Sequence, residues 1–177
     1  MDRQELDTAA RELLGRPLTD DEAVFVEPLA AACQVLHDHP VAPGMRVGVL
    51  GSGRLGLLCG QALAAANCRP SVIGRNPNSL RLARRLGLPT IDVAELDPRP
   101  TYDLIVECTG APEGFSLAAK LVRPRGAIVL KSTYAEKTRP DLASIVINEI
   151  RVIGSRCGPF PDAIQLLRDG RVRVEEL

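Results

Sequence analysis

The sequence of 177 residues contains no tryptophan, and only 3% of its residues are aromatic. Its 22 basic and 22 acidic residues leave no formal net charge. Because no basic tract with interleaved aromatic residues occurs, we expect no nucleic acid partner. No apolar run is long enough to cross a bilayer, so we expect no membrane partner either. The core must be built from aliphatic side chains, which is typical of a parallel sheet covered by helices.

Other features are also missing. The N-terminus has no apolar segment of the kind found in signal peptides, so a cytoplasmic protein is expected. The five cysteines are scattered, and no Cys-x-x-Cys spacing occurs, which argues against a thioredoxin-like motif and a zinc ribbon. We expect reduced thiols, with Cys59 and Cys108 as small buried hydrophobic residues. His37 and His39 do not share a helix face, which favours a surface cap over a metal site.

The chain shows a regular alternation of apolar strand patterns with helix patterns. Thr19 and Glu22 form a capping-box pattern at the start of one helix, and Pro28 predicts a kink or break inside it. Alternating strands and helices predict an α/β fold, a doubly wound parallel six-stranded sheet with helices on both faces. Strands are expected at residues 46–50, 71–74, 90–93, 103–108, 127–131 and 150–154. Helices are expected at residues 2–14, 19–37, 55–66, 76–86, 112–122 and 161–169.

The most informative segment is the apolar run Val47–Leu50, which leads into a Gly-x-Gly-x-x-Gly motif. In a strand–turn–helix unit the first glycine permits the tight turn, the second lets a pyrophosphate approach the backbone, and the third lets helix and strand pack closely. The helix N-terminus then faces the phosphates. This context predicts a Rossmann dinucleotide-binding domain over residues 41–177, preceded by a helical segment over 1–40. A structural glycine turn in another α/β protein is the alternative. The candidate contacts are Gly51, Ser52, Gly53, Arg54, Leu55 and Gly56.

The end of the second expected strand bears on which cofactor binds. An NAD site has an acidic residue about 20 residues beyond the glycines, where it accepts hydrogen bonds from the ribose. Here Gly74, Arg75 and Asn76 occupy this place, and none is a carboxylate. Arg75 offers a donor fork for a 2′-phosphate, so the sequence predicts NADP, with NAD as second choice. Arg81, Arg84 and Arg85 follow nearby, and we expect at least two of these three to form only a solvated helix face.

Ligands of doubly wound sheets bind outside the carboxyl ends of the strands. Small and polar residues follow the later strands here, and they are candidates for the nicotinamide half of the cofactor or, alternatively, loop caps. Glu107 lies inside an apolar strand, and a structural role is favoured for it because a buried carboxylate needs hydrogen-bonding partners. The candidates after these strands are Thr109, Gly110, Lys131, Ser132, Ser155 and Arg156.

From about Leu18 onward, the chain resembles the coenzyme-binding half of the medium-chain dehydrogenase/reductase family, the zinc-type alcohol and polyol dehydrogenases. The resemblance implies reversible hydride transfer between a nicotinamide cofactor and an alcohol or carbonyl, with zinc as Lewis acid. Glu27 matches a position that lies next to the catalytic zinc in polyol-type members. The segments that carry the resemblance are Asp21–Leu29, Gly51–Leu58, Val106–Glu113, Leu121–Gly126 and Ile153–Arg156.

The rest of the family's metal site comes from an N-terminal catalytic domain with a catalytic cysteine and a Gly-His-Glu motif, neither of which occurs here. We therefore expect no zinc in this chain, which binds nucleotide without turning over alcohol by itself. A fragment of an oxidoreductase, an enzyme whose catalytic domain is a separate chain, and a non-catalytic nucleotide-binding or dimerisation module all remain open. The resemblance also implies a homodimer through an edge strand near Ile150–Gly154 or Val172–Val174.

Overall fold

The computed structural model of the chain describes residues 4–5, 7–8, 11, 17–133 and 140–177. Six strands form one parallel sheet in the order β3-β2-β1-β4-β5-β6, which confirms the predicted doubly wound fold. The strands are β1 Val47–Leu50, β2 Ser71–Gly74, β3 Thr90–Asp92, β4 Tyr102–Glu107, β5 Val122–Leu130 and β6 Arg151–Gly154. The helices are α2 Asp20–Asp38, α3 Arg54–Ala65, α4 Pro77–Arg85, α5 Pro112–Leu121, α6 Leu142–Ile147 and α7 Phe160–Arg168, with a short 3-10 turn at Val93–Glu95.

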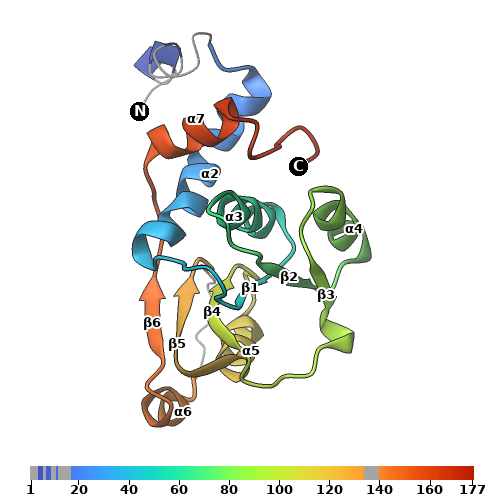
Figure 1. Ribbon diagram of the computed structural model, residues 1–177, viewed down its shortest axis with the longest axis vertical. Coiled ribbons are helices and arrows are strands. Elements are labelled where there is room, and N and C mark those ends of the chain that lie inside the picture. The colour runs from blue at the N-terminus through green and yellow to red at the C-terminus, as the bar shows by residue number, and fades with distance from the viewer. Residues whose placement is uncertain (1–3, 6, 9–10, 12–16, 134–139) are drawn as a thin grey trace.

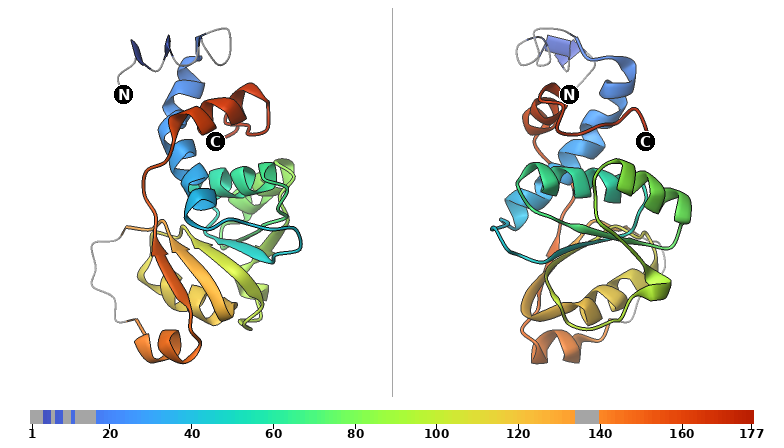
Figure 2. Two further views of the ribbon diagram at one scale, coloured as in Figure 1. Left: turned by 60° about the vertical axis from the view of Figure 1, so that its left-hand side comes forward. Right: turned by 45° about the vertical axis from the view of Figure 1, so that its right-hand side comes forward.

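Helices cover both faces of the sheet, and the alternation of side chains along each strand supplies both faces with apolar residues (Figures 1 and 2). Val49 and Val106 point into the larger core cluster, which they share with α2, α3 and α7. Their neighbours Leu50 and Ile105 point into the second cluster, beneath α5. Because the central strands are buried on both sides, they have continuous aliphatic sequences.

The helix α2 begins as predicted and continues past Pro28. The side chain of Thr19 accepts a hydrogen bond from the Glu22 amide, and the Glu22 carboxylate accepts one from the Thr19 amide, which confirms the capping box. The predicted break at Pro28 is wrong, because α2 is continuous from Asp20 to Asp38. The carbonyl that loses its helical donor at Pro28 belongs to Val24, which is 71% exposed, so water can reach it.

Two further elements differ from the predictions. β5 begins at Val122 rather than Ala127. The prediction missed its first part because residues 123–125 are exposed and include Pro124, so this part has no apolar strand pattern. The helix α6 was not predicted at all, since it is short and leaves Leu142, Val146 and Ile147 exposed. The helix predicted over residues 2–14 falls for the most part outside the described residues. The division of the chain at residue 40 stays a prediction; α2 itself belongs to the same core cluster as β1 and α3.

The segment that follows α7 passes over α3 and ends at the C-terminus, marked C in Figure 1. Val172 and Val174 are buried there. The buried side chain of Gln61 donates a 3.1 Å hydrogen bond to the Arg173 carbonyl and accepts one of 2.9 Å from the Arg173 amide. The side chain of Gln61 thus pairs with both backbone polar groups of Arg173, as a neighbouring strand would. None of the described helices combines the length and apolar character that crossing a membrane would take.

Candidate functional site

The glycine turn joins β1 to α3, and the surroundings of each glycine differ. Gly51 has a φ of +116°, a conformation that only glycine adopts easily, and its amide donates a 2.8 Å hydrogen bond to the Ile73 carbonyl. Gly56 packs so closely on the Gly51 carbonyl that a Cβ atom there would overlap it. Gly53 has no neighbour within 4 Å of its Cβ position and precedes α3 without a side-chain cap. The turn is therefore rigid at its two ends and open in its middle.

A cavity of about 450 Å³ lies beside this turn, between the carboxyl ends of β1, β2 and β4. It brings together seven of the residues predicted from the sequence: Gly51, Ser52, Gly53, Gly74, Arg75, Asn76 and Thr109. The other lining residues are Leu50, Ile73, Ser79, Val93, Cys108, Ala111, Glu113, Gly114 and Leu117. The predicted residues that do not line it are Arg54, Leu55, Gly56, Gly110, Lys131, Ser132, Ser155 and Arg156.

Arg75 stands at the end of β2 and is exposed. Within the part of the chain that the structure describes, no ion pair engages its guanidinium, so it is free to meet a ligand. Its neighbour Asn76 instead caps α4, accepting hydrogen bonds from the amides of Asn78 at 2.9 Å and Ser79 at 3.3 Å. The cavity thus has one available cation at the end of β2 and no acidic residue there.

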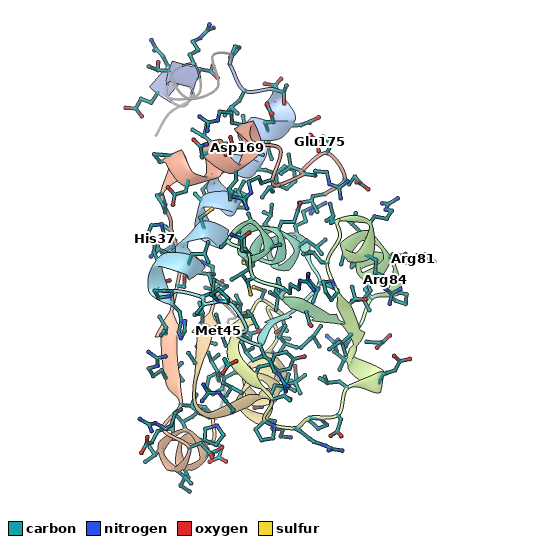
Figure 3. The ribbon with its side chains drawn as sticks, viewed as in Figure 1. His37, Met45, Arg81, Arg84, Asp169 and Glu175 are labelled. Atoms are coloured by element: carbon teal, nitrogen blue, oxygen red, sulfur yellow. The ribbon has the colours of Figure 1, made fainter. Side chains whose placement is uncertain are left out.

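The other arginines of this region lie elsewhere. Arg81 and Arg84 project from the outer side of α4 (Figure 3). Arg84 donates a 2.7 Å hydrogen bond to Thr90, and Arg85 pairs with Glu176 at 3.1 Å. None of the three lines the cavity, in accord with the solvated helix face expected for at least two of them.

The loop after β4 is held by a buried carboxylate. Oε1 of Glu107 accepts hydrogen bonds from the amide of Thr109 at 2.7 Å and from its hydroxyl at 2.5 Å. Ser132 accepts a 2.8 Å hydrogen bond from the Gly110 amide, and so connects the loops after β4 and β5. These contacts hold in place the loop that carries Thr109, which lines the cavity. They give Glu107 the structural role expected from the sequence.

Two thiols lie next to this loop. Sγ of Cys108 donates to Sγ of Cys59 over 3.9 Å. This hydrogen bond and burial raise the pKa of the Cys108 thiol well above its ordinary value. Cys59 is fully buried. Both are free cysteines in the structure. Cys59 is the small buried hydrophobic residue expected, whereas Cys108 is only partly buried and lines the cavity.

Lys131 is buried at the end of β5 and joins three elements. Its Nζ donates hydrogen bonds to the Ala31 carbonyl of α2 at 2.7 Å, to Ser155 Oγ at 3.0 Å and to the Arg156 carbonyl at 3.0 Å. All three acceptors are uncharged, and burial lowers the pKa of the lysine. Three of the predicted site residues after β5 and β6, Lys131, Ser155 and Arg156, are therefore joined to one another and to α2, and none of them lines the cavity.

The described residues contain no cluster of metal-ligating side chains. Nowhere among them do three His, Cys, Asp or Glu side chains gather as zinc ligands would. Glu27, which matches a family position next to zinc, is exposed on α2. Among the described residues, Glu27 therefore has no companion ligands for a zinc ion.

Several cavity residues were missed by sequence reasoning. Glu113 and Gly114 belong to the first turn of α5, and Ser79 to that of α4. They could have been predicted from the rule that ligands bind at the carboxyl edge of the sheet. Each helix that follows a strand begins at this edge, so the first turns of these helices are also candidates.

Comparison with known proteins agrees with this geometry. A family model described as zinc-binding dehydrogenase matches residues 55–169, more than half of the chain. A putative D-xylulose reductase of Agrobacterium fabrum is 27% identical over 169 residues, which cover 88% of this chain and 48% of the relative. D-xylulose reductase A of Aspergillus oryzae is 29% identical over 175 residues, 88% of this chain and 49% of the relative. The chain therefore spans about half the length of the curated relatives it matches.

Solved structures show the same likeness. A putative zinc-binding dehydrogenase of Sinorhizobium meliloti bound to NADP superposes with a TM-score of 0.80 at 25% identity, over 88% of this chain and 50% of the other. A short chain alcohol dehydrogenase of Escherichia coli complexed with NADH gives a TM-score of 0.80 at 25% identity, over 90% and 51%. Similar folds thus hold either nicotinamide cofactor, so the choice must depend on local residues.

Proposed function

This chain belongs to the zinc-binding dehydrogenase family, within the medium-chain dehydrogenases/reductases, and from that premise we propose that its cavity binds NADP(H) in preference to NAD(H). The glycine turn would receive the pyrophosphate, since Gly53 leaves the backbone open at the N-terminus of α3. The adenosine ribose would then lie at the end of β2, beside Gly74 and Arg75. This part of the cofactor decides between the two nucleotides.

The observation that carries the proposal is the pairing of Gly74 with an unengaged Arg75 at the end of β2. A carboxylate at this place would accept from the ribose hydroxyls and repel a 2′-phosphate, whereas Gly74 does neither. The guanidinium of Arg75 can donate two charge-assisted hydrogen bonds to a phosphate. The NADP-bound relative from Sinorhizobium meliloti supports the proposal.

For the whole protein we propose hydride transfer between NADP(H) and an alcohol or carbonyl, as the names of the relatives suggest. When bound, the cofactor supplies the hydride chemistry. This chain's part is to bind and orient the nucleotide along the carboxyl edge of the sheet. Because the described residues hold no metal-ligand cluster, turnover would require a catalytic domain that supplies the remaining groups.

The test is a titration of the chain with NADPH and with NADH, followed for the wild type, Arg75→Ala and Arg84→Ala. Arg84 is the matched control, because it is an exposed arginine on α4 that does not line the cavity. We expect Arg75→Ala to weaken NADPH binding about 10- to 100-fold, the value of a charge-assisted hydrogen bond, and to leave NADH binding unchanged. Arg84→Ala should change neither. Equal wild-type affinity for both cofactors, or an equal loss with both variants, would contradict the NADP assignment.

We also propose that the chain forms a homodimer through the free edge of β6. This strand ends the sheet, and Val152 on it is 42% exposed. Exposed apolar residues continue the surface onto α6, where Val146 is 75% and Ile147 78% exposed. The other predicted edge, Val172–Val174, is not a strand, and both its valines are buried on the chain's own core.

The oligomeric state tests this second proposal. We expect sedimentation of the wild type as a dimer and of Val152→Lys as a monomer, because a charge at the edge of a sheet blocks strand pairing. Val24→Lys replaces a valine that is 71% exposed on α2 and should leave the dimer intact. A monomeric wild type, or a dimer that survives Val152→Lys, would refute the β6 interface.

A further inference from the structure

We propose that Ser52 and Gly74 act as a coupled pair that determines cofactor choice. Ser52 fills the space beside residue 74, and so it excludes from that position any side chain, including the acidic residue that would favour NAD. The inference rests on the proposed cofactor site, and it concerns which substitutions that site can accept.

The two residues are in direct contact across the glycine turn. A methyl group at the Cβ position of residue 74 would lie 2.6 Å from Cβ of Ser52, and closer still to its hydroxyl. Non-bonded carbon atoms pack at about 3.5–4.0 Å, so this is a severe overlap. Rotation of the serine side chain moves only the hydroxyl. The Cβ atom of Ser52 is fixed by the backbone, and therefore the overlap cannot be relieved by a rotamer change.

The backbone itself has little freedom at this point. The amide of Gly51 donates a 2.8 Å hydrogen bond to the Ile73 carbonyl, which fixes the turn against the end of β2. On the other side, Cδ2 of Leu80 would lie 3.2 Å from a Cβ at residue 74, and Leu80 is itself buried. Residue 74 is thus confined between the turn and α4. A side chain there must displace the turn that is to hold the pyrophosphate.

Ser52 therefore contributes to the preference for NADP without needing to touch the phosphate. It keeps an acidic side chain off residue 74, and Arg75 is the only charged residue of β2 and its following turn to line the cavity. In consequence, a single Gly74→Asp substitution does not convert the site to NAD. The acidic residue becomes acceptable only when Ser52 is also reduced to glycine.

The unliganded protein tests the contact independently of any cofactor. Thermal unfolding is measured for Gly74→Ala, Ser52→Gly and the double variant, in which alanine adds only a methyl group and no charge. We expect Gly74→Ala to lower Tm by roughly 5–10 °C and Ser52→Gly to restore most of that loss. Ser52→Ala should restore much less, because its Cβ remains in place. An equal Tm for Gly74→Ala with and without Ser52→Gly would overturn the proposal.

Cofactor titration then tests the consequence. We expect Gly74→Asp alone to bind both NADPH and NADH poorly, and Ser52→Gly with Gly74→Asp to shift the NADPH-to-NADH affinity ratio at least 100-fold toward NADH. If Gly74→Asp alone reverses the preference at an unchanged Tm, the coupling is refuted while the NADP proposal stands. If the wild type binds neither cofactor, both proposals fail.

Discussion

The hydroxyl of Thr109 donates a 2.5 Å hydrogen bond to Oε1 of Glu107, and the first turn of α5 packs directly onto this pair. Glu107 is fully buried, and its other oxygen has no hydrogen-bonding partner among the described residues. The arrangement leaves no room above the carboxylate. Residue 114 can approach only because it is glycine, since a Cβ there would overlap both Thr109 Oγ1 and Glu107 Oε1.

We therefore expect Gly114→Ala to destabilise the chain by about 2–3 kcal/mol, as overpacking of a core does. This sign is informative, because glycine to alanine in a helix is ordinarily favourable by about 0.5–1 kcal/mol. Urea denaturation gives the free energy of unfolding. Gly154→Ala is the control, with no neighbour within 4 Å of its Cβ position and an expected change within about 0.5 kcal/mol. Stabilisation by Gly114→Ala would show that the contact with Glu107 is not tight.

The glycine turn offers a second comparison, between a glycine expected to serve binding and one expected to serve packing. Gly53→Ala adds a methyl group into open space, so we expect unchanged stability but at least a tenfold loss of NADPH affinity, because the pyrophosphate must approach that backbone. Gly56→Ala forces an overlap with the Gly51 carbonyl, and we expect a loss of about 1–3 kcal/mol in the free energy of unfolding. Denaturation and titration of both variants separate the two roles. Full NADPH affinity in Gly53→Ala would argue against the proposed pyrophosphate position.

The sheet and its order could be predicted because each central strand is an aliphatic run followed by turn residues. Gly51 and Gly87 mark ends of elements by their backbone freedom, and both have positive φ in the structure. The candidate site was predictable to the same extent, since seven cavity residues directly follow β1, β2 or β4 or end one of these strands. Contacts between distant segments were not predictable. The pairing of Gln61 with Arg173 joins residues 112 positions apart, and no local pattern announces it.

The contact of Ser52 with Gly74 belongs to this second kind. Ser52 was a candidate only as part of a motif, and Gly74 only as the place of a missing acid. The sequence shows that the acid is absent, whereas the structure shows why its return would be resisted. The extension of α2 through Pro28 has a similar origin, because solvent exposure of Val24 depends on how the helix packs against α3 and α7.

The buried ammonium of Lys131 leads to a prediction about pH. Its hydrogen bonds to Ala31 and Arg156 end on carbonyls that Lys131→Met would leave without this donor. We expect the substitution to cost about 1–3 kcal/mol at pH 7, the usual penalty for an unsatisfied buried polar group.

The cost should increase as the pH rises. Burial lowers the pKa of Lys131 in the folded protein below its ordinary value of 10.5, so between the lowered pKa and 10.5 the unfolded chain holds more protons. The free energy of unfolding of the wild type therefore increases with pH through that window. The free energy of unfolding of Lys131→Met does not show this increase. Urea denaturation of both proteins at pH 7 and near pH 10 measures the difference, and the exposed Lys120→Met controls for the loss of one positive charge. A difference that stays constant or narrows toward alkaline pH would mean that the Lys131 ammonium is not strained by its burial.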